Sequence, residues 1–171
     1  MSSGQIKVAD HKGVFVIKME GDVRLTLCLS FDEFIEHMFA APDFCAVIFD
    51  LCDAVAIDST TLGLMAKISI RGRAMEFDAP YVVSSNPNIT RLLASMGFED
   101  IFYIVESADA LEMPIVDTES ATALDENIVD ESQVHNSVLD AHRTLMELNS
   151  TNHNTFKELV AALEGEQKPC R

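Results

Sequence analysis

One short segment constrains the fold of this chain more than any other. Residues 46–49 (Ala-Val-Ile-Phe) are apolar without alternation, which predicts a strand covered on both faces. A polar cluster, Asp58–Thr61, follows and opens a stretch with helical spacing of apolar residues, which we expect to end near Gly72. This strand–turn–helix unit places the Ser59 hydroxyl at the positive end of a helix dipole. Ser59 is therefore either a plain N-cap or a residue that is chemically modified.

The rest of the first hundred residues alternates between strand and helix patterns. The expected strands cover residues 6–9, 14–20, 23–29, 81–83 and 102–105, and the expected helices cover about 30–41 and 86–96. Lys12 and Gly13 predict a tight hairpin turn, Ser30 and Glu33 a capping box, and Gly97 the end of a helix. Because strands that alternate with helices need crossover connections, we expect an α/β fold. Its mixed sheet would be mostly parallel, with an N-terminal antiparallel hairpin, and covered by helices.

The character of the chain changes after residue 106, which divides it into a domain over 1–106, a linker over 107–133 and a helical extension over 134–166. Nine acidic residues and no Lys or Arg lie between Glu106 and Glu131, which predicts an extended, partly disordered linker. The extension carries a seam with alternating spacings of four and three: Val138, His142, Leu145, Asn149, Asn152, Phe156, Leu159 and Leu163. One long helix or a helical hairpin that turns at residues 149–152 satisfies this seam, and the weak helix propensity of 149–153 favours a break.

Charge and residue usage exclude several classes of function. The formal net charge of −16 argues against nucleic acid and anionic membrane partners, because both would repel the chain. No apolar run approaches the roughly 20 residues that span a bilayer, and the first residues lack a signal-peptide pattern, so we expect a cytoplasmic protein. The four cysteines form no CxxC, and we expect the three in apolar surroundings to be buried. We expect no metal, no cofactor and no enzymatic activity, since no nucleophile–base pair or phosphate loop is recognisable in the sequence.

Three blocks of sequence together resemble one family. They are Val47–Leu51, Ile57–Leu64 with its Asp-Ser motif, and Ser84–Phe102 with Asn86-Pro87, Met96-Gly97-Phe98 and Ile101-Phe102. In this order and at these spacings, residues 6–106 resemble a STAS domain, the fold of bacterial anti-sigma factor antagonists. The tail, from 142–145 to 159–160, is similar to an extension of some gamma-proteobacterial members. Those members act as output partners of response regulators in sigma-factor or biofilm control.

The resemblance implies a partner-switching function without catalysis. In the family, the serine of the Asp-Ser motif is phosphorylated by an anti-sigma factor that is also a serine kinase of the GHKL type. A PP2C-type phosphatase, in some arrangements fused to a response regulator, removes the phosphate. The matching residue is Ser59, with Thr60 as a second hydroxyl, and Thr61 stands where the family commonly has glycine. The implied partner surface comprises Asp58, Ser59, Thr60, Thr61, Leu62 and Asn86.

Two questions stay open at the level of the sequence. The alternative function is a constitutive STAS scaffold or transport accessory module without a phospho-switch. The C-terminal extension could form a homodimer through its helix, cover the domain, or bind a second partner.

Overall fold

The computed structural model describes residues 3–111, 121–127 and 130–166. The strands are β1 (Gln5–His11), β2 (Val14–Val23), β3 (Ala46–Ile57), β4 (Tyr81–Val83), β5 (Tyr103–Val105) and β6 (Thr122–Ala123). The α-helices are α1 (Cys28–Ala40), α2 (Ser59–Ala74), α3 (Pro87–Ser95), α4 (Glu131–Leu148) and α5 (Ser150–Glu166). Short 3-10 turns occupy Leu25–Leu27, Phe98–Asp100 and Ala108–Ala110.

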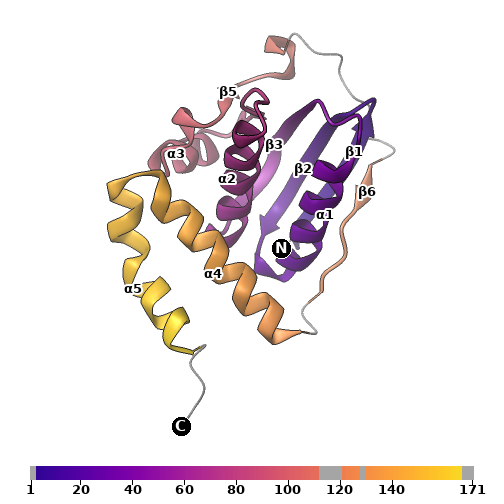
Figure 1. The fold of residues 1–171 in the computed structure, drawn as a ribbon. Helices are drawn as coiled ribbons and strands as arrows, with labels where there is room; N and C mark the ends of the chain where they lie inside the picture. The colour runs from indigo at the N-terminus through magenta and orange to yellow at the C-terminus, as the bar shows by residue number, and fades with distance from the viewer. Residues whose placement is uncertain (1–2, 112–120, 128–129, 167–171) are drawn as a thin grey trace.

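The strands form a mixed sheet in the order β5-β4-β3-β2-β1-β6 (Figure 1). β2, β3, β4 and β5 are parallel neighbours, whereas β1 is antiparallel to both β2 and β6. The predicted two-residue turn joins β1 to β2, with positive φ angles of 51° at Lys12 and 88° at Gly13. Such a turn matches the right-handed twist of a hairpin. The predicted α/β fold with a mostly parallel sheet and an N-terminal hairpin is therefore confirmed.

The length of β3 determines where α2 begins. β3 pairs with β4 over Ile48–Asp50 but runs on to Ile57 beside β2. The β2–β3 register shifts between Lys18 and Glu20 and again between Gly21 and Asp22, as at β-bulges, which locally re-aim a strand. Because β3 extends beyond β4, the start of α2 lies past the part of the sheet that β4 and β5 share.

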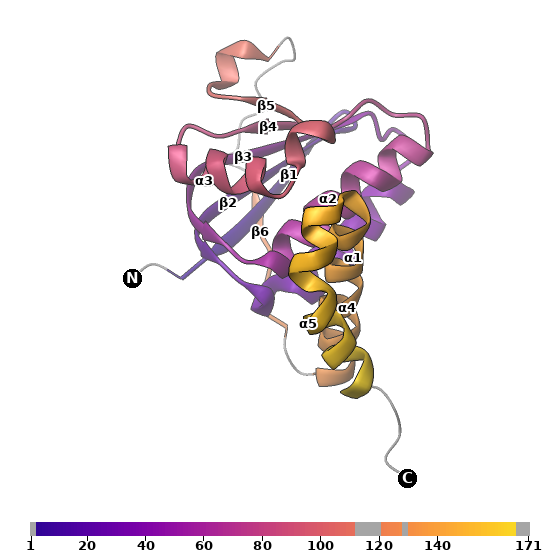
Figure 2. The ribbon, with the colours of Figure 1, turned by 90° about the vertical axis from the view of Figure 1, so that its left-hand side faces the viewer.

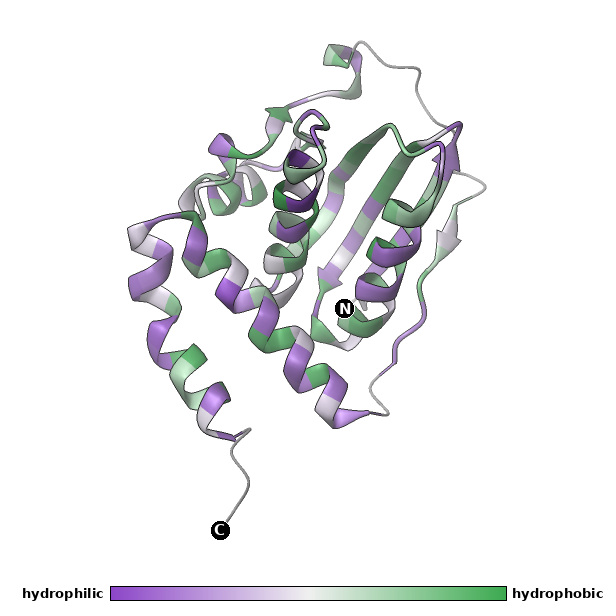
Figure 3. Cartoon of the chain, viewed as in Figure 1, coloured by the Kyte–Doolittle hydropathy of each residue, from purple (hydrophilic) through white to green (hydrophobic). Residues whose placement is uncertain are grey.

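One apolar core fills the space between the sheet and its helices. α1 and α2 lie on the same face of the sheet (Figures 1 and 2), and α3 adds Ile89 and Leu93 to the same cluster. Phe31 of α1, Phe49 of β3 and Met65 of α2 are fully buried there. Figure 3 shows green bands along the central strands and alternating green and purple along the helices. This is the pattern of amphipathic helices packed on a covered sheet.

The strand that the sequence predicts over residues 23–29 is wrong. β2 ends at Val23, Leu25–Leu27 forms a 3-10 turn, and α1 already begins at Cys28. Leu25 is 40% exposed while Cys28 is 2% exposed, so the two faces implied by alternation do not exist. The predicted capping box at Ser30 is also wrong, because Leu27 is the N-cap and its side chain makes no cap bond.

The acidic segment after β5 contributes more structure than its composition predicts. Thr122 and Ala123 pair with Val8 and Lys7 as β6, and Leu124 donates its N–H to the Ile6 carbonyl at 2.8 Å. A two-residue strand of threonine and alanine carries no periodic signal, so sequence analysis could not find it. Residues 112–120 and 128–129 of the predicted linker lie outside the described residues.

The C-terminal extension forms a helical hairpin, the second of the two arrangements that its sequence allows. Asn149 separates α4 from α5, and its side-chain oxygen accepts the Asn152 N–H at 2.8 Å. α4 lies across α1 and α2, and α5 packs along α4 (Figure 2). Ala141, Leu145 and Phe156 belong to the same apolar core as the sheet. The extension therefore covers the helical layer of its own chain.

The cysteines depart in part from the expectation that they are buried. Cys28 is buried, whereas Cys45 and Cys52 are exposed. Cys45 directly precedes β3 and Cys52 lies on it, and their apolar sequence neighbours concealed that both are exposed. All three are free thiols.

Candidate functional site

Asp58 builds the start of α2. Its backbone is extended (φ −78°, ψ 167°), and its Oδ1 atom accepts the Thr61 N–H at 2.9 Å. Its Oδ2 atom accepts the Leu25 N–H at 2.7 Å, and its own N–H donates to the Val23 carbonyl at 3.1 Å. Asp58 is thus the N-cap, and it ties α2 to the end of β2. The interpretation of Ser59 as a plain N-cap is wrong, because Ser59 is the first residue inside the helix.

The Ser59 hydroxyl contacts the C-terminal extension. Its Oγ atom lies 2.7 Å from Nε2 of His142, a residue of α4. The other ring nitrogen, Nδ1, lies 2.7 Å from the Val138 carbonyl oxygen. A carbonyl oxygen only accepts, so Nδ1 carries a proton, and in the neutral ring Nε2 accepts the proton of the Ser59 hydroxyl. The sequence predicts His142 to be a packed residue, which agrees with its 2% exposure and with its ring centroid 5.3 Å from that of Phe156.

Ser59 carries the least buried hydroxyl of the first turn of α2. Its side chain is half-buried, whereas Thr60 is 3% exposed and Thr61 is 2% exposed. Leu62 is also buried, at 1%. Of the six residues predicted to form a partner surface, Thr60, Thr61 and Leu62 therefore face the interior in this conformation.

Asn86 occupies a different part of the molecule from Ser59. It is the N-cap of α3, where its side-chain oxygen accepts the Asn88 N–H at 3.0 Å. α3 follows β4, which pairs with β3 near Asp50, whereas Ser59 follows the far end of β3. Both helices follow strands that run in the same direction, but α3 begins close to Asp50 of β3, whereas α2 begins beyond the end of β3.

Two exposed apolar side chains, one four residues before Ser59 and one bonded through its N–H to Asp58, were missed by sequence analysis. Val55 is 68% exposed on β3, and Leu25 is 40% exposed beside the Asp58 carboxylate that holds its N–H. Leu25 lies in the segment 23–29 that the sequence predicts as a strand, which does not form. Val55 belongs to an apolar run whose outward residues could be found only from the β2–β3 register.

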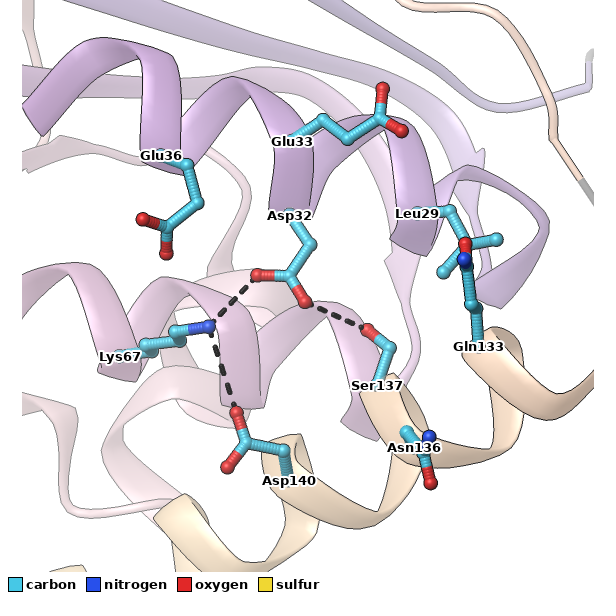
Figure 4. A pocket seen from close by; sticks show the side chains of 9 residues that line it. All are labelled: Leu29, Asp32, Glu33, Glu36, Lys67, Gln133, Asn136, Ser137 and Asp140. Carbon is cyan, nitrogen blue, oxygen red and sulfur yellow. Dashed lines mark hydrogen bonds and ion pairs between the residues drawn. The ribbon is translucent and has the colours of Figure 1, made fainter. Parts of the chain in front are cut away.

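A polar hollow of about 460 Å³ opens where α1, α2 and α4 meet. Figure 4 shows Lys67 of α2 between two carboxylates, with Nζ 2.8 Å from Asp32 and 3.6 Å from Asp140. Ser137 donates its hydroxyl to the other oxygen of Asp32 at 3.3 Å. Burial lowers the pKa of Lys67, but the hydrogen bond and charge of Asp32, followed by Asp140 and Glu36, outweigh it and raise that pKa. These groups fasten the three helices together and keep Lys67 protonated.

We searched the described residues for a metal site and for a membrane-spanning helix. Within 3–111, 121–127 and 130–166, no group of three or more His, Cys, Asp or Glu side chains is placed to hold a metal ion. No helix in the described part of the chain combines the length and apolar character that a membrane span requires.

Comparison with known proteins supports the fold. No family model and no curated protein matches the sequence. Among solved structures, the chain is similar to an anti-sigma factor antagonist from Mycobacterium paratuberculosis, with 21% identity and a TM-score of 0.50. The match covers 63% of this chain and 89% of that protein. The STAS-type fold that the sequence motifs indicate is thus the fold that the chain adopts.

Proposed function

We propose that this protein is an anti-sigma factor antagonist that switches partners through phosphorylation of Ser59. The observation that carries the proposal is the position of the Ser59 hydroxyl in the first turn of α2. Its side chain is half-buried, while the neighbouring Thr60 and Thr61 hydroxyls are buried. The solved protein of similar fold carries the name of an anti-sigma factor antagonist. A kinase would therefore modify Ser59 in preference to Thr60.

The electrostatics of this site suit a binding switch. The docking face would combine Ser59 and Asp58 with the exposed apolar side chains of Leu25 and Val55. Phosphorylation adds about −1.5 to −2 charges at neutral pH, beside the Asp58 carboxylate. The helix N-terminus tolerates that charge in the free protein, but burying an unpaired dianion in a complex costs several kcal/mol. Since about 1.4 kcal/mol is a tenfold change in affinity, the phosphorylated form would release its partner.

The partners follow from the same proposal. The unphosphorylated form would bind an anti-sigma factor that is also a serine kinase of the GHKL type. A PP2C-type phosphatase, which could be fused to a response regulator, would restore the binding form. The protein itself would act by binding, without catalysis.

One experiment tests the switch directly. Protein isolated from its native cells would be analysed by intact mass and phosphopeptide mapping, and Ser59→Ala and Ser59→Asp variants would be compared in partner pull-downs. We expect phosphate on Ser59, capture of a kinase-like anti-sigma factor by Ser59→Ala, and loss of that capture in Ser59→Asp. Ser107→Asp is the matched control, because Ser107 is exposed and lies after β5. A chain that never carries phosphate and binds equally as both Ser59 variants would disprove the switch.

A constitutive scaffold is the second candidate function, and one observation favours it. The Ser59 hydroxyl already has a structural partner in His142 of the same chain. In that case Ser59 serves to attach α4, and substitution of Ser59 by Asp alters stability but leaves partner binding unchanged. The pull-downs described above separate the two functions.

A further inference from the structure

The α4–α5 hairpin covers the face of α2 that carries Ser59. His142 lies at the centre of the contact. It is 2% exposed, and its Nε2 atom accepts a hydrogen bond from the Ser59 hydroxyl. The polar turn of the hairpin is attached separately, because Asn152 donates from Nδ2 to the Met96 carbonyl at 2.9 Å. The opposite end is attached by the Lys67–Asp140 and Ser137–Asp32 contacts (Figure 4). Ser59 therefore sits inside an intramolecular interface.

The backbones of α2 and α4 approach closely one helical turn beyond Ser59. A Cβ atom added to Gly63 would lie 2.3 Å from the Ala141 carbonyl oxygen and 2.7 Å from the Ala141 Cβ. Such distances are too short for any contact, so α4 fits only because residue 63 is glycine. The interface has little room to adjust at this point, since packed cores do not deform continuously.

A phosphate on Ser59 would replace the hydrogen bond that holds this interface at His142. Phosphorylation removes the hydroxyl that donates a hydrogen bond to His142. It also places three oxygen atoms and a double negative charge against the ring. The ring cannot turn its other nitrogen to the phosphate without giving up the Val138 carbonyl, and Phe156 packs against it.

The cations of α2 and α4 nearest this contact are already engaged. Lys67 pairs with Asp32 and Asp140, and Arg71 pairs with Glu36. Arg143 of α4 pairs with Glu164 of α5 at 3.2 Å. The charged group on the α2 side of the phosphate would be the Asp58 carboxylate, which repels it. The dianion would thus lie beside the Asp58 carboxylate, while Lys67, Arg71 and Arg143 already have acidic partners.

We propose that phosphorylation of Ser59 and docking of the α4–α5 hairpin on α2 are mutually exclusive. The hairpin is then an intramolecular cover that the phosphate releases, so the modification also exposes the buried face of α2. This inference rests on the proposed function, because it takes Ser59 as the phosphorylated residue. It adds a change in the protein's own shape to the electrostatic switch.

The test uses the full chain with phosphoserine incorporated during synthesis at position 59, so that no kinase or partner is needed. Hydrogen exchange of the backbone amides, followed by mass spectrometry, reports on α4 and α2 separately. We expect exchange in α4 to accelerate about tenfold or more while α2 stays protected, because the hairpin detaches without unfolding the domain. Phosphoserine at Ser107 is the matched control, since this residue is exposed and follows β5.

A second variant opens the interface without adding charge. Gly63→Ala keeps the Ser59 hydroxyl and His142 but clashes with Ala141, so we expect it also to accelerate exchange in α4. Unchanged α4 protection in the phosphoserine-59 protein would overturn the inference, even if partner binding switches. Opening of the hairpin with no change in partner binding would instead overturn the proposed function and leave this inference standing.

Discussion

At the scale of single residues, Asp58 and Ser59 have separate tasks that their adjacency in the sequence conceals. Asp58 holds backbone N–H groups of both Leu25 and Thr61, so it caps α2 and fixes the preceding turn. Ser59 is thereby free to direct its hydroxyl to a partner, which in this conformation is His142. The Asp-Ser motif thus combines a residue that caps α2 with a residue whose hydroxyl contacts α4.

The capping role of Asp58 leads to a prediction about stability. Asp58→Ala should lower the free energy of unfolding by about 1–2 kcal/mol or slightly more, because two backbone donors lose their acceptor. Asp58→Asn should retain much of the stability, since asparagine is also a good N-cap. Urea unfolding measures both variants. Asp130→Ala is the matched control, because Asp130 caps α4 through the Gln133 N–H and should cost less. An Asp58→Ala protein as stable as the unmodified chain would contradict the assignment.

At the scale of secondary structure elements, the sequence predicted those elements whose signals are local. The strand before Asp58, the helix after it, the Lys12–Gly13 turn and the end of α3 at Gly97 all carry their own turn or cap residues. The prediction of a strand over 23–29 is wrong because the same residues can also form a 3-10 turn followed by a helix. Burial in the assembled fold decides between the two. β6 failed because its pairing partner, not its composition, makes it a strand.

Sequence analysis could predict only the part of the site that lies in one continuous segment. Asp58 and Ser59 were found from the motif, but the partner of Ser59 lies 83 residues away in the chain. The seam containing His142 identified a face to be buried without naming what buries it. The seam also loses its register after the break at Asn149, because Leu159 is 43% exposed and Val160 is 5% exposed. Contacts between distant segments depend on the assembled fold, which no spacing rule encodes.

Lys67 joins three helices, and we predict that its loss destabilises the protein in a pH-dependent way. Lys67→Met should lower the free energy of unfolding by about 1–3 kcal/mol at neutral pH, because Asp32 and Asp140 lose their partly buried partner. The pKa of Lys67 is raised in the folded chain, so its contribution is complete below the unfolded value of about 10.5. It is lost as the pH rises through the folded pKa.

Urea unfolding of the Lys67→Met variant from pH 6 to pH 11 checks this prediction. The difference from the unmodified protein should be constant up to about pH 9.5 and shrink above about pH 10.5. Lys157→Met on the exposed side of α5 is the control and should change little at any pH. A difference that instead grows as the pH rises would contradict the assigned pairing.

At the scale of the whole molecule, the C-terminal extension is part of the core. His142, Leu145, Asn152 and Phe156 of the predicted seam are buried within their own chain. The surface that the sequence left available for a homodimer is therefore already occupied. Because Ala141, Leu145 and Phe156 share one apolar cluster with the sheet, hairpin and sheet should support each other's stability.

Because the seam residues are buried within their own chain, we predict that the full chain is a monomer. Light scattering coupled to size exclusion should give a mass near 18.9 kDa, independent of protein concentration. Gly63→Ala loosens the hairpin from α2 and so frees the same apolar faces, which a second copy can cover. We therefore expect its mass to rise with concentration, since an exposed contiguous apolar face favours association. An unmodified chain of twice the monomer mass, with α4 still protected from hydrogen exchange, would place the dimer contact elsewhere on the molecule. A dimer whose α4 protection disappears on dilution would show instead that the hairpin is shared between two chains.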